Sequence, residues 1–355
     1  MTTYFKVTLV ALLFGLIGGV VGQILADAYI SPLIEIFPDS PTDQVKSIPE
    51  LKRSSEFTGT DNDILVNQVV NKAKEATVGI YRASASFGRS SFLGNGTILT
   101  SDGWLLSHQD VTGNLATDQL KVIYKNEAFA VEELASDSLT GATFLKINKQ
   151  NLPVVTFNDW QVLFAGQAVV AINAFNDTLV TNIENKMWDS DPATNRNTET
   201  FDVYIALRDN ANSNFDGAVV YNLGGTVVGL LTTIQNRSVA IPPNYFINKI
   251  PSVLKDKIIE RPELGVQYQN LATTIGLLEF GSKGALITSS PAGGSPADQA
   301  GIEINDIVTQ VNGVEVDAQN DLALLVQDHR VGDQINLTVV RDGEEINLEI
   351  FLGKL

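Results

Sequence analysis

The sequence contains few side chains that could act as a nucleophile or as a general base. It has no cysteine, which excludes disulfides, thiolate nucleophiles and cysteine metal sites. It has two histidines, His108 and His329, so a mechanism that requires an imidazole base has almost no candidates. The 41 acidic and 24 basic residues give a net charge of −17, which repels nucleic acid. We therefore expect no nucleic-acid partner.

A stretch with the pattern loop, strand, turn, strand spans Asp209 to Leu231. Its leading loop is rich in turn-forming residues, and two β-branched runs follow it, which is typical of a β-hairpin that presents a loop. A hydroxyl on such a loop, flanked by glycines, could act as an acyl-transfer nucleophile. The loop offers Ser213, Phe215 and Asp216 ahead of Gly217. We expect Gly217 to serve the turn.

The loop from Asp189 to Thr200 is polar and is the main candidate for a metal site. Its oxygen-bearing residues are Asp189, Asp191, Asn195, Asn197 and Glu199. Their spacing does not fit a calcium-binding loop, so we interpret them as a solvated loop. The sequence also contains no phosphate-binding glycine motif. We therefore expect neither a metal nor a cofactor.

The amino-terminal region carries an uncharged apolar run over residues 7–26. Such a run is long enough to cross a bilayer as a helix, and we predict a single transmembrane span. Lys6 precedes the run, and Asp27 and Glu35 follow it. This weak charge bias places the amino end in the cytoplasm and the remaining domains on the other side of the membrane.

A cleaved signal peptide is the alternative, because Ala26, Asp27 and Ala28 have the small-x-small form of a cleavage site. We assign residues 1–30 to the anchor and residues 31–60, which are rich in proline and polar residues, to a flexible linker. A helix is expected over residues 61–76, with Asp61 or Asp63 as its cap.

Residues 61–255 are expected to form one domain. Between residues 77 and 250 its apolar runs are short and rich in Val, Ile, Thr and Phe, and Gly, Asn or Asp interrupts them at short intervals. This pattern predicts an antiparallel sandwich or a pair of barrels. The clearest hairpin joins Phe92–Thr100 to Trp104–Ser107.

Four segments of this region resemble HtrA/Deg-family serine proteases in the family's order. They are GNGTILTSDGWLLSHQDV (residues 94–111), SDSLTGATFLKI (136–147), the hairpin of residues 209–231 and SVAIPPNYF (238–246). The resemblance implies a mainly β, trypsin-like domain of two six-stranded antiparallel barrels. It also implies trimers, which the sequence itself does not test.

The catalytic positions depart from the family pattern. By the resemblance, the histidine position holds Asp110, the aspartate position holds Gly141, and the serine position holds Phe215 or, with an insertion, Asp216. We therefore interpret the triad as lost. A carboxylate at Asp216 would oppose the negative charge that acyl transfer develops.

A triad rebuilt from neighbouring residues would have to use His108, Asp137 and Ser213. Each lies two to four residues from its family position, so three loops would have to shift together, although a triad tolerates only about 0.5 Å of misplacement. The alternative reading of His108 is a partly solvated polar residue at the end of a strand.

Residues 261–355 resemble the PDZ domain that follows the protease domain in HtrA-type proteins, over the whole module. GALITSSPAGGSPADQAGIEINDIVTQVNGVEV (residues 284–316) carries most of the likeness. The resemblance implies that the loop Leu264–Gly265–Val266 receives the terminal carboxylate of a peptide. Leu322 and Leu325, on a helix near residues 319–327, would line the side-chain pocket, unless they pack in the core. His329 would cap this helix.

These features favour a membrane-anchored, HtrA-like pseudoprotease. It would bind peptide or protein carboxyl termini, or unfolded exported proteins, in quality control of the bacterial envelope or in regulation of an active relative. One alternative is an active serine endopeptidase with displaced catalytic residues. The other is a non-enzymatic scaffold that uses the barrels for assembly.

Overall fold

The computed structural model describes residues 2–25, 60–191, 195–274 and 282–355. Helix α1 (Thr2–Leu25) covers most of the expected span, and side chains are described only for Thr8 and residues 14–25. Within the described part of the chain, no helix is both long and apolar enough to cross a membrane. The expected linker of residues 31–60 lies outside the described residues, except for Thr60. Residues 59–355 form one compact unit.

Helix α3 (Asp61–Ala76) forms where the apolar periodicity predicts it, but its cap differs from the expectation. Thr60 is the N-cap, and its hydroxyl accepts a hydrogen bond from the backbone N–H of Asp63. The carboxylate of Asp63 accepts from the backbone N–H of Thr60 in return, which completes a capping box. Asp63 is thus the acidic partner in the box.

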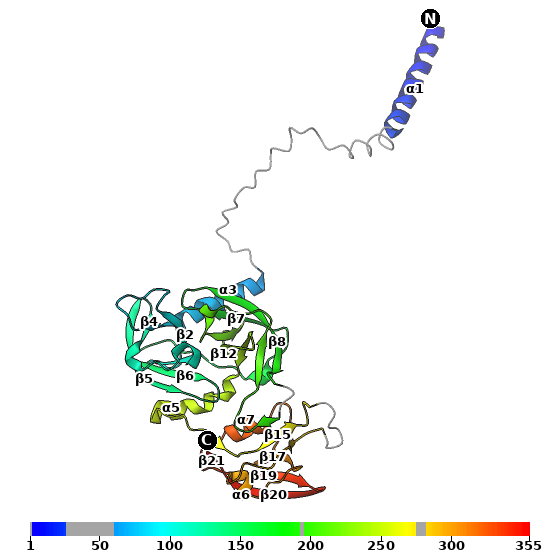
Figure 1. Ribbon diagram of the computed structural model, residues 1–355. Helices are drawn as coiled ribbons and strands as arrows, with labels where there is room; N and C mark the ends of the chain where they lie inside the picture. Colours follow the sequence, from blue (N-terminus) through cyan, green and yellow to red (C-terminus); the bar gives the residue numbers. More distant parts are fainter. Residues whose placement is uncertain (1, 26–59, 192–194, 275–281) are drawn as a thin grey trace. The chain divides into compact units, whose positions relative to one another are not determined.

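The first barrel is a closed antiparallel sheet with the strand order β1-β2-β3-β6-β5-β4. Figure 1 labels β2, β4, β5 and β6 among its strands. Its strands are β1 (Thr77–Arg82), β2 (Phe92–Ile98), β3 (Trp104–His108), β4 (Leu120–Tyr124), β5 (Glu127–Ser136) and β6 (Ala142–Ile147). The predicted hairpin of β2 and β3 is confirmed, with Thr97 opposite Leu106. Strand β3 also pairs with β6, which places His108 opposite Ala142.

The second barrel is closed in the order β10-β13-β12-β11-β7-β8. Its strands are β7 (Ala168–Ile172), β8 (Thr178–Asp189), β10 (Val203–Leu207), β11 (Val219–Asn222), β12 (Val227–Ile234) and β13 (Arg237–Ile241). The hairpin of β11 and β12 is the one predicted from residues 209–231, and its leading loop contains the short 3-10 turn η5 (Ser213–Phe215). The expected pair of six-stranded barrels is therefore confirmed.

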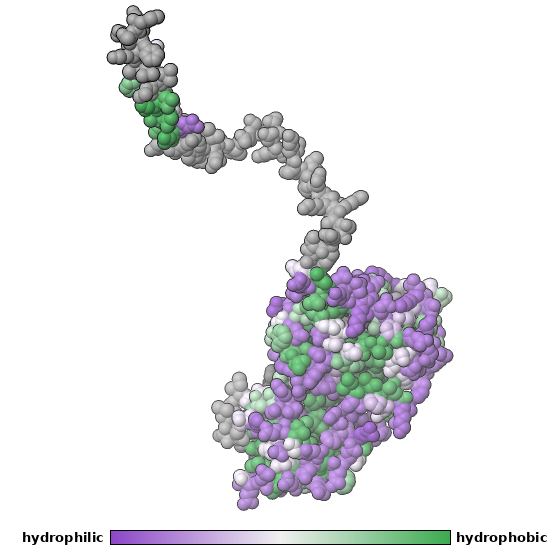
Figure 2. Space-filling view, turned by 180° about the vertical axis from the view of Figure 1, so that it is seen from behind, coloured by the Kyte–Doolittle hydropathy of each residue, from purple (hydrophilic) through white to green (hydrophobic). Residues whose placement is uncertain are grey.

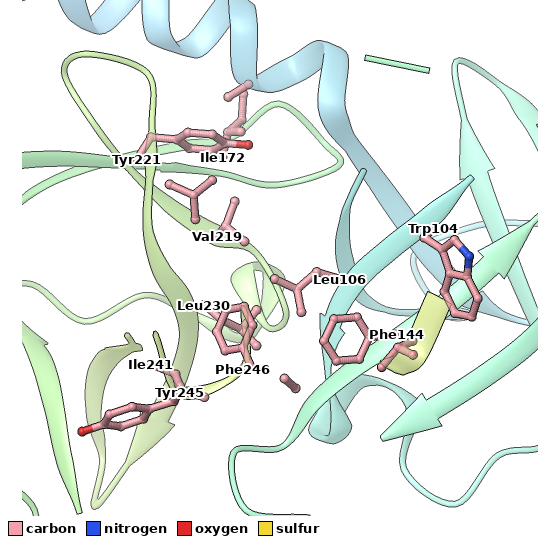
Figure 3. Close-up of a cluster of buried hydrophobic side chains, with 14 of the residues drawn as sticks. Trp104, Leu106, Phe144, Ile172, Val219, Tyr221, Leu230, Ile241, Tyr245 and Phe246 are labelled. Carbon is pink, nitrogen blue, oxygen red and sulfur yellow. The ribbon is translucent and has the colours of Figure 1, made fainter. Parts of the chain in front are cut away.

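Large apolar side chains from both barrels meet in one buried cluster (Figure 3). Leu106 and Phe144 come from β3 and β6 of the first barrel, whereas Val219 and Leu230 come from β11 and β12 of the second. All four are at most 2% exposed. This burial holds the end of β3 and the loop before β11 at fixed positions, because close-packed interiors resist displacement.

The carboxyl-terminal domain is built on a sheet with the strand order β20-β19-β17-β16-β15-β9, to which β18 is added at β17. Its own elements are β14 (Pro262–Glu263), β15 (Gln267–Asn270), β16 (Ala285–Ile287), α6 (Pro296–Gln299), β17 (Ile307–Val311), β18 (Val314–Glu315), α7 (Leu322–Gln327), β19 (Gln334–Arg341), β20 (Glu344–Phe351) and β21 (Gly353–Lys354). The edge strand β9 (Arg196–Asn197) comes from the loop between β8 and β10 of the second barrel.

Helix α5 (Ile250–Asp256) follows the second barrel and precedes the carboxyl-terminal domain. On the face of residues 59–355 that Figure 2 shows, hydrophilic residues cover most of the surface, and hydrophobic residues form smaller patches between them.

Candidate functional site: a degenerate catalytic centre and a peptide groove

His108 lies at the end of β3 and caps the short helix α4 (Gln109–Thr112). Its Nδ1 lies 3.0 Å from a carboxylate oxygen of Asp110 and 3.3 Å from the backbone nitrogen of Asp110. The residue is 6% exposed, so the expectation of a partly solvated side chain is wrong. The strand end is covered because β3 lies between two partners in a closed barrel.

The burial of His108 disfavours the protonated form of its imidazole. Burial lowers the pKa of His108 below its ordinary value, because an imidazolium ion is poorly solvated there. The charge of Asp110 and a hydrogen bond with the backbone of Thr140 oppose this shift without cancelling it. Both edges of the ring therefore already have partners.

Gly141 leaves no room for a catalytic aspartate beside this ring. A Cβ added at Gly141 would lie 2.4 Å from Nε2 of His108. The backbone of Gly141 also has a φ of +71°, which side-chain-bearing residues rarely adopt. The imidazole of His108 thus lies next to the position that the resemblance assigns to the acid.

Asp137, the other candidate acid, is completely buried and forms a bidentate ion pair with Arg261. Its Oδ1 accepts from Nε of Arg261 at 2.9 Å, and Oδ2 accepts from Nη2 of the same guanidinium and from the hydroxyl of Thr140 at 2.5 Å. Arg261 also donates to the backbone oxygen of Tyr245 at 2.7 Å. Asp137 therefore connects the first barrel to the start of the carboxyl-terminal domain.

The loop that presents the nucleophile in a two-barrel protease is folded on itself here. Asn212 caps η5, and its side-chain oxygen accepts from the N–H of Asn214 at 2.9 Å. The N–H groups of Phe215 and Asp216 donate to the backbone oxygens of Asn212 and Ser213. An oxyanion hole needs N–H groups that point at the reacting atom, and these three already have acceptors.

Two residues of this loop and the other two members of the possible triad lie in different environments. Phe215 is 5% exposed and packs in the core of the second barrel, together with Trp160 and Val220. Ser213 is exposed on η5, whereas His108 is buried and Asp137 is bound to Arg261. The structure therefore does not bring Ser213, His108 and Asp137 together as a triad, because one is exposed, one is buried and one is paired with Arg261.

Asp216 and Asp110 place two carboxylates in the centre. Burial raises the pKa of Asp216, and the negative charge of Asp110 raises it further. The hydroxyl of Thr232, on β12, lies 3.5 Å from Oδ2 of Asp110. Among the residues that the structure describes, no group of three or more His, Asp or Glu side chains could hold a metal ion.

Asn95, on β2, holds the loop against the first barrel, and the sequence reasoning missed it. It is 0% exposed, and its amide donates to the backbone oxygens of Asn214 and Asp216 at 2.8 and 3.0 Å. Its side-chain oxygen accepts from the N–H of Ala174. The available signal was an asparagine inside a predicted strand, between Gly94 and Gly96, because buried amides require partners.

The second candidate site is the groove between β15 and α7. Gly265 has a φ of +84°, and a Cβ there would lie 2.5 Å from Cβ of Ser295, so the loop at residues 264–266 requires glycine. The N–H groups of Leu264 and Gly265 both donate to Oε1 of Glu199, at 2.9 and 3.0 Å. Glu199 thus lies where the terminal carboxylate of a peptide is expected.

The expectation that residues 189–200 form a solvated loop is wrong for its second half. Strand β9 pairs with β15, and Thr198 is 0% exposed. Polarity alone does not show burial when the partner is an edge strand that supplies backbone hydrogen bonds. The first half of the loop contains Asp189, which forms an ion pair with Arg196 at 2.8 Å.

Helix α7 contains the two leucines predicted for the side-chain pocket. Leu322 is 0% exposed and belongs to the core of the carboxyl-terminal domain, and Leu325 is partly buried against that core. Their role in a peptide pocket stays a prediction. His329 contacts the end of the helix, with Nδ1 2.9 Å from the backbone oxygen of Leu325.

Comparisons with known proteins agree with this architecture. The family model described as "PDZ domain" matches residues 262–352. A protein of Rhizobium meliloti named probable periplasmic serine endoprotease DegP-like is 31% identical over 72% of this chain and 53% of its own length. A protein of the same name from a Marinomonas species is 29% identical over 75% of this chain and 58% of its own. A solved structure described as "HtrA-type protease AlgW with decapeptide" superposes with a TM-score of 0.60 and 23% identity, over 82% of this chain and 98% of that one.

The chain is an HtrA/DegP-type protein in fold and domain order. The two closed barrels form the trypsin-like domain of this architecture, and the β15–α7 groove belongs to its PDZ domain. This HtrA-type chain spans slightly more than half the length of the curated relatives it matches. These relatives are named as serine endoproteases, so the fold is that of a protease.

Proposed function

We propose that this HtrA-type protein is a pseudoprotease that binds peptides or unfolded exported proteins through its PDZ domain. The observation that carries the proposal is the loop before β11, where Phe215 is buried in the barrel core and the N–H groups of residues 214–216 already have acceptors. A serine protease needs a hydroxyl and free N–H donors at this place.

The charges of the centre support the same proposal. Asp110 and Asp216 put negative charge where acyl transfer develops an oxyanion, and like charges repel. Burial, and after it the charge of Asp110, raises the pKa of Asp216, so this position already disfavours negative charge in the ground state. The imidazole of His108 is bound by Asp110 and the Thr140 backbone, so it has no free edge for a substrate.

Peptide binding is proposed to use the loop Leu264–Gly265–Val266 and the edge of β15, with Leu322 and Leu325 at the side-chain pocket. The structure of the HtrA-type protease AlgW with a decapeptide supports a peptide-binding role for this architecture. The names of the curated relatives support an extracytoplasmic location. We propose in addition that residues 7–26 anchor the chain in the membrane and that it forms trimers.

The experiment that tests the proposal is incubation of the purified chain with casein and with a fluorophosphonate probe. The relative from Rhizobium meliloti, which is named as a serine endoprotease, is the positive control. We expect no cleavage and no labelled serine. Labelling of Ser213, or of any other serine, together with casein cleavage would refute the proposal.

An active endopeptidase is the second candidate, because the matched relatives are named as proteases. It would require Ser213 to leave η5 and Asp137 to leave Arg261. A scaffold without peptide binding is the third candidate. Titration of peptides with free carboxyl termini distinguishes it from the leading proposal. A peptide-binding protein shows saturable binding that a bulky residue at Gly265 abolishes, whereas a scaffold shows no saturable binding.

A further inference from the structure

The segment Asn195–Glu199 of the trypsin-like domain lies along the peptide groove of the PDZ domain. Strand β9 runs antiparallel to β15, with Asn197 opposite Gln267 and Arg196 opposite Tyr268. The N–H of Thr198 donates to the backbone oxygen of Val266 at 3.2 Å. These are the direction and the backbone bonds of a peptide that is added to a sheet edge.

The end of this segment reproduces a terminal carboxylate. Oε1 of Glu199 accepts from the N–H groups of Leu264 and Gly265, and Oγ1 of Thr198 accepts from the N–H of Val266 at 3.3 Å. The hydroxyl of Thr198 also donates to Oε1 of Glu199 at 2.7 Å. Two side-chain oxygens thus take the places of the two oxygens of a chain end.

The backbone of Thr198 is held from the other side of the groove by α7. Nε2 of Gln327 donates to the backbone oxygen of Thr198 at 3.0 Å and to that of Pro262 at 2.8 Å. Both Thr198 and Gln327 are at most 1% exposed. The segment is therefore held from both sides of the groove, by β15 and by α7.

An arginine of the segment is recognised by an acid at the start of α7. Arg196, two residues before Thr198, donates from Nη1 to Oδ2 of Asp321 at 2.6 Å, and its side chain is 13% exposed. Asp321 is the N-cap of α7 and is oriented by Tyr268 and Asn270. Burial disfavours the charge of Arg196, yet Asp321 and Asp189 raise its pKa above the ordinary value.

We propose that residues 195–199 are an internal ligand of the PDZ groove, and that the external ligands of the groove are peptides with a free terminal carboxylate and an arginine two residues before the last residue. This inference rests on the proposed peptide-binding function and specifies its ligand and its control. An external peptide binds by displacing the internal segment. Displacement releases residues 195–199, which precede β10, so occupancy of the groove is transmitted to the second barrel.

The competition follows from mass action. When a groove is filled internally, its apparent affinity for an external peptide equals the affinity of the open groove multiplied by the fraction of molecules in which the groove is open. Removing the carboxylate of Glu199 therefore increases the affinity for the peptide. Removing the charge of Asp321 abolishes the preference for arginine, and Asp321→Asn retains a side chain that caps helices well.

The test uses the full chain and a fluorescein-labelled peptide that ends in Asn-Arg-Asn-Thr with a free carboxylate, together with a companion peptide in which Glu replaces Arg. We expect Glu199→Ala to bind the arginine peptide at least about tenfold more tightly than the wild type does. Glu127→Ala is the matched control, because it removes the same charge from an exposed side chain in the first barrel that pairs with Lys149. Asp321→Asn should bind the two peptides with similar affinities.

Amide hydrogen exchange gives a readout that needs no external ligand. We expect the N–H groups of Leu264 and Gly265 to exchange at least about tenfold faster in Glu199→Ala than in the wild type and in Glu127→Ala. Equal exchange in all three proteins, or equal affinity of the wild type and Glu199→Ala for the arginine peptide, overturns the internal ligand. Faster exchange without binding of either peptide overturns the proposed peptide-binding function and the ligand assignment, and leaves the internal contact intact.

Discussion

The buried ion pair between Asp137 and Arg261 provides the sharpest test of how the domains are held together. Replacing Arg261 by methionine leaves the carboxylate of Asp137 at 0% exposure, without its bidentate partner. Loss of one partner from a buried pair costs about 3–5 kcal/mol, because the remaining charge is neither solvated nor compensated. We expect Arg261→Met to lower the free energy of unfolding by this amount, measured by urea denaturation.

The double variant Asp137→Leu/Arg261→Met separates the cost of an unpaired charge from the value of the pair. Among the described residues, Nη1 of Arg261 has no hydrogen-bond partner, so the native pair is not fully satisfied. We expect the double variant to recover to within about 1 kcal/mol of the wild type, since apolar residues of similar volume replace buried ion pairs well.

A surface pair provides the matched control for this experiment. Arg237 pairs with Glu184, and their side chains are 31% and 49% exposed. We expect Arg237→Met to cost about 0–1 kcal/mol, as exposed pairs do. If Arg261→Met costs no more than this control, or if the double variant is as unstable as the single one, the argument from burial fails. Arg261→Met should also cleave no casein, because freeing Asp137 does not free His108.

Three further predictions follow from the same geometry. Burial lowers the pKa of Lys249 to about 8 from its ordinary 10.5. The cost of keeping its ammonium group charged in the folded chain is therefore present below pH 8 and is relieved as the pH rises towards 10.5. The free energy of unfolding should rise by about 1–2 kcal/mol across this window in the wild type and not in Lys249→Met, measured by denaturation at each pH. Gly141→Asp should destabilise the chain by about 1–3 kcal/mol without restoring activity, because the new side chain meets His108 and φ is +71°; unchanged denaturation would contradict this. By NMR, His108 should titrate below its ordinary value and lower still in Asp110→Asn, because Asp110 favours the imidazolium; an upward shift would refute this assignment.

Much of the architecture could be predicted from local patterns. Short alternating runs indicated antiparallel strands, and the Phe92–Thr100 and Asp209–Leu231 segments formed the expected hairpins. Strand β8 was not predicted, because TLVTNIENKMWD is polar and only weakly alternating. Its pairing with β7 and β10 in a closed barrel stabilises a conformation that local propensity does not favour.

The candidate site could be predicted only in its residue types. From the sequence, the loss of the triad could be inferred, because the family positions hold Asp110, Gly141, and Phe215 or Asp216. The partners of these residues lie far away along the chain, and so no local pattern contains them. Asn95 binds the loop at residues 214–216, and Arg261 binds Asp137, across separations of more than a hundred residues.

The sequence by itself determined which chemical groups are available: no thiol, two imidazoles, and carboxylates where a catalytic base and nucleophile would be expected. Tertiary structure alone decided what those groups contact. A polar stretch with several acidic residues reads as solvated, but the edge of β15 and the N–H groups of Leu264 and Gly265 convert Glu199 into a bound carboxylate. Backbone donors have no signature in side-chain identity, which is why the occupied groove is visible only in the folded chain.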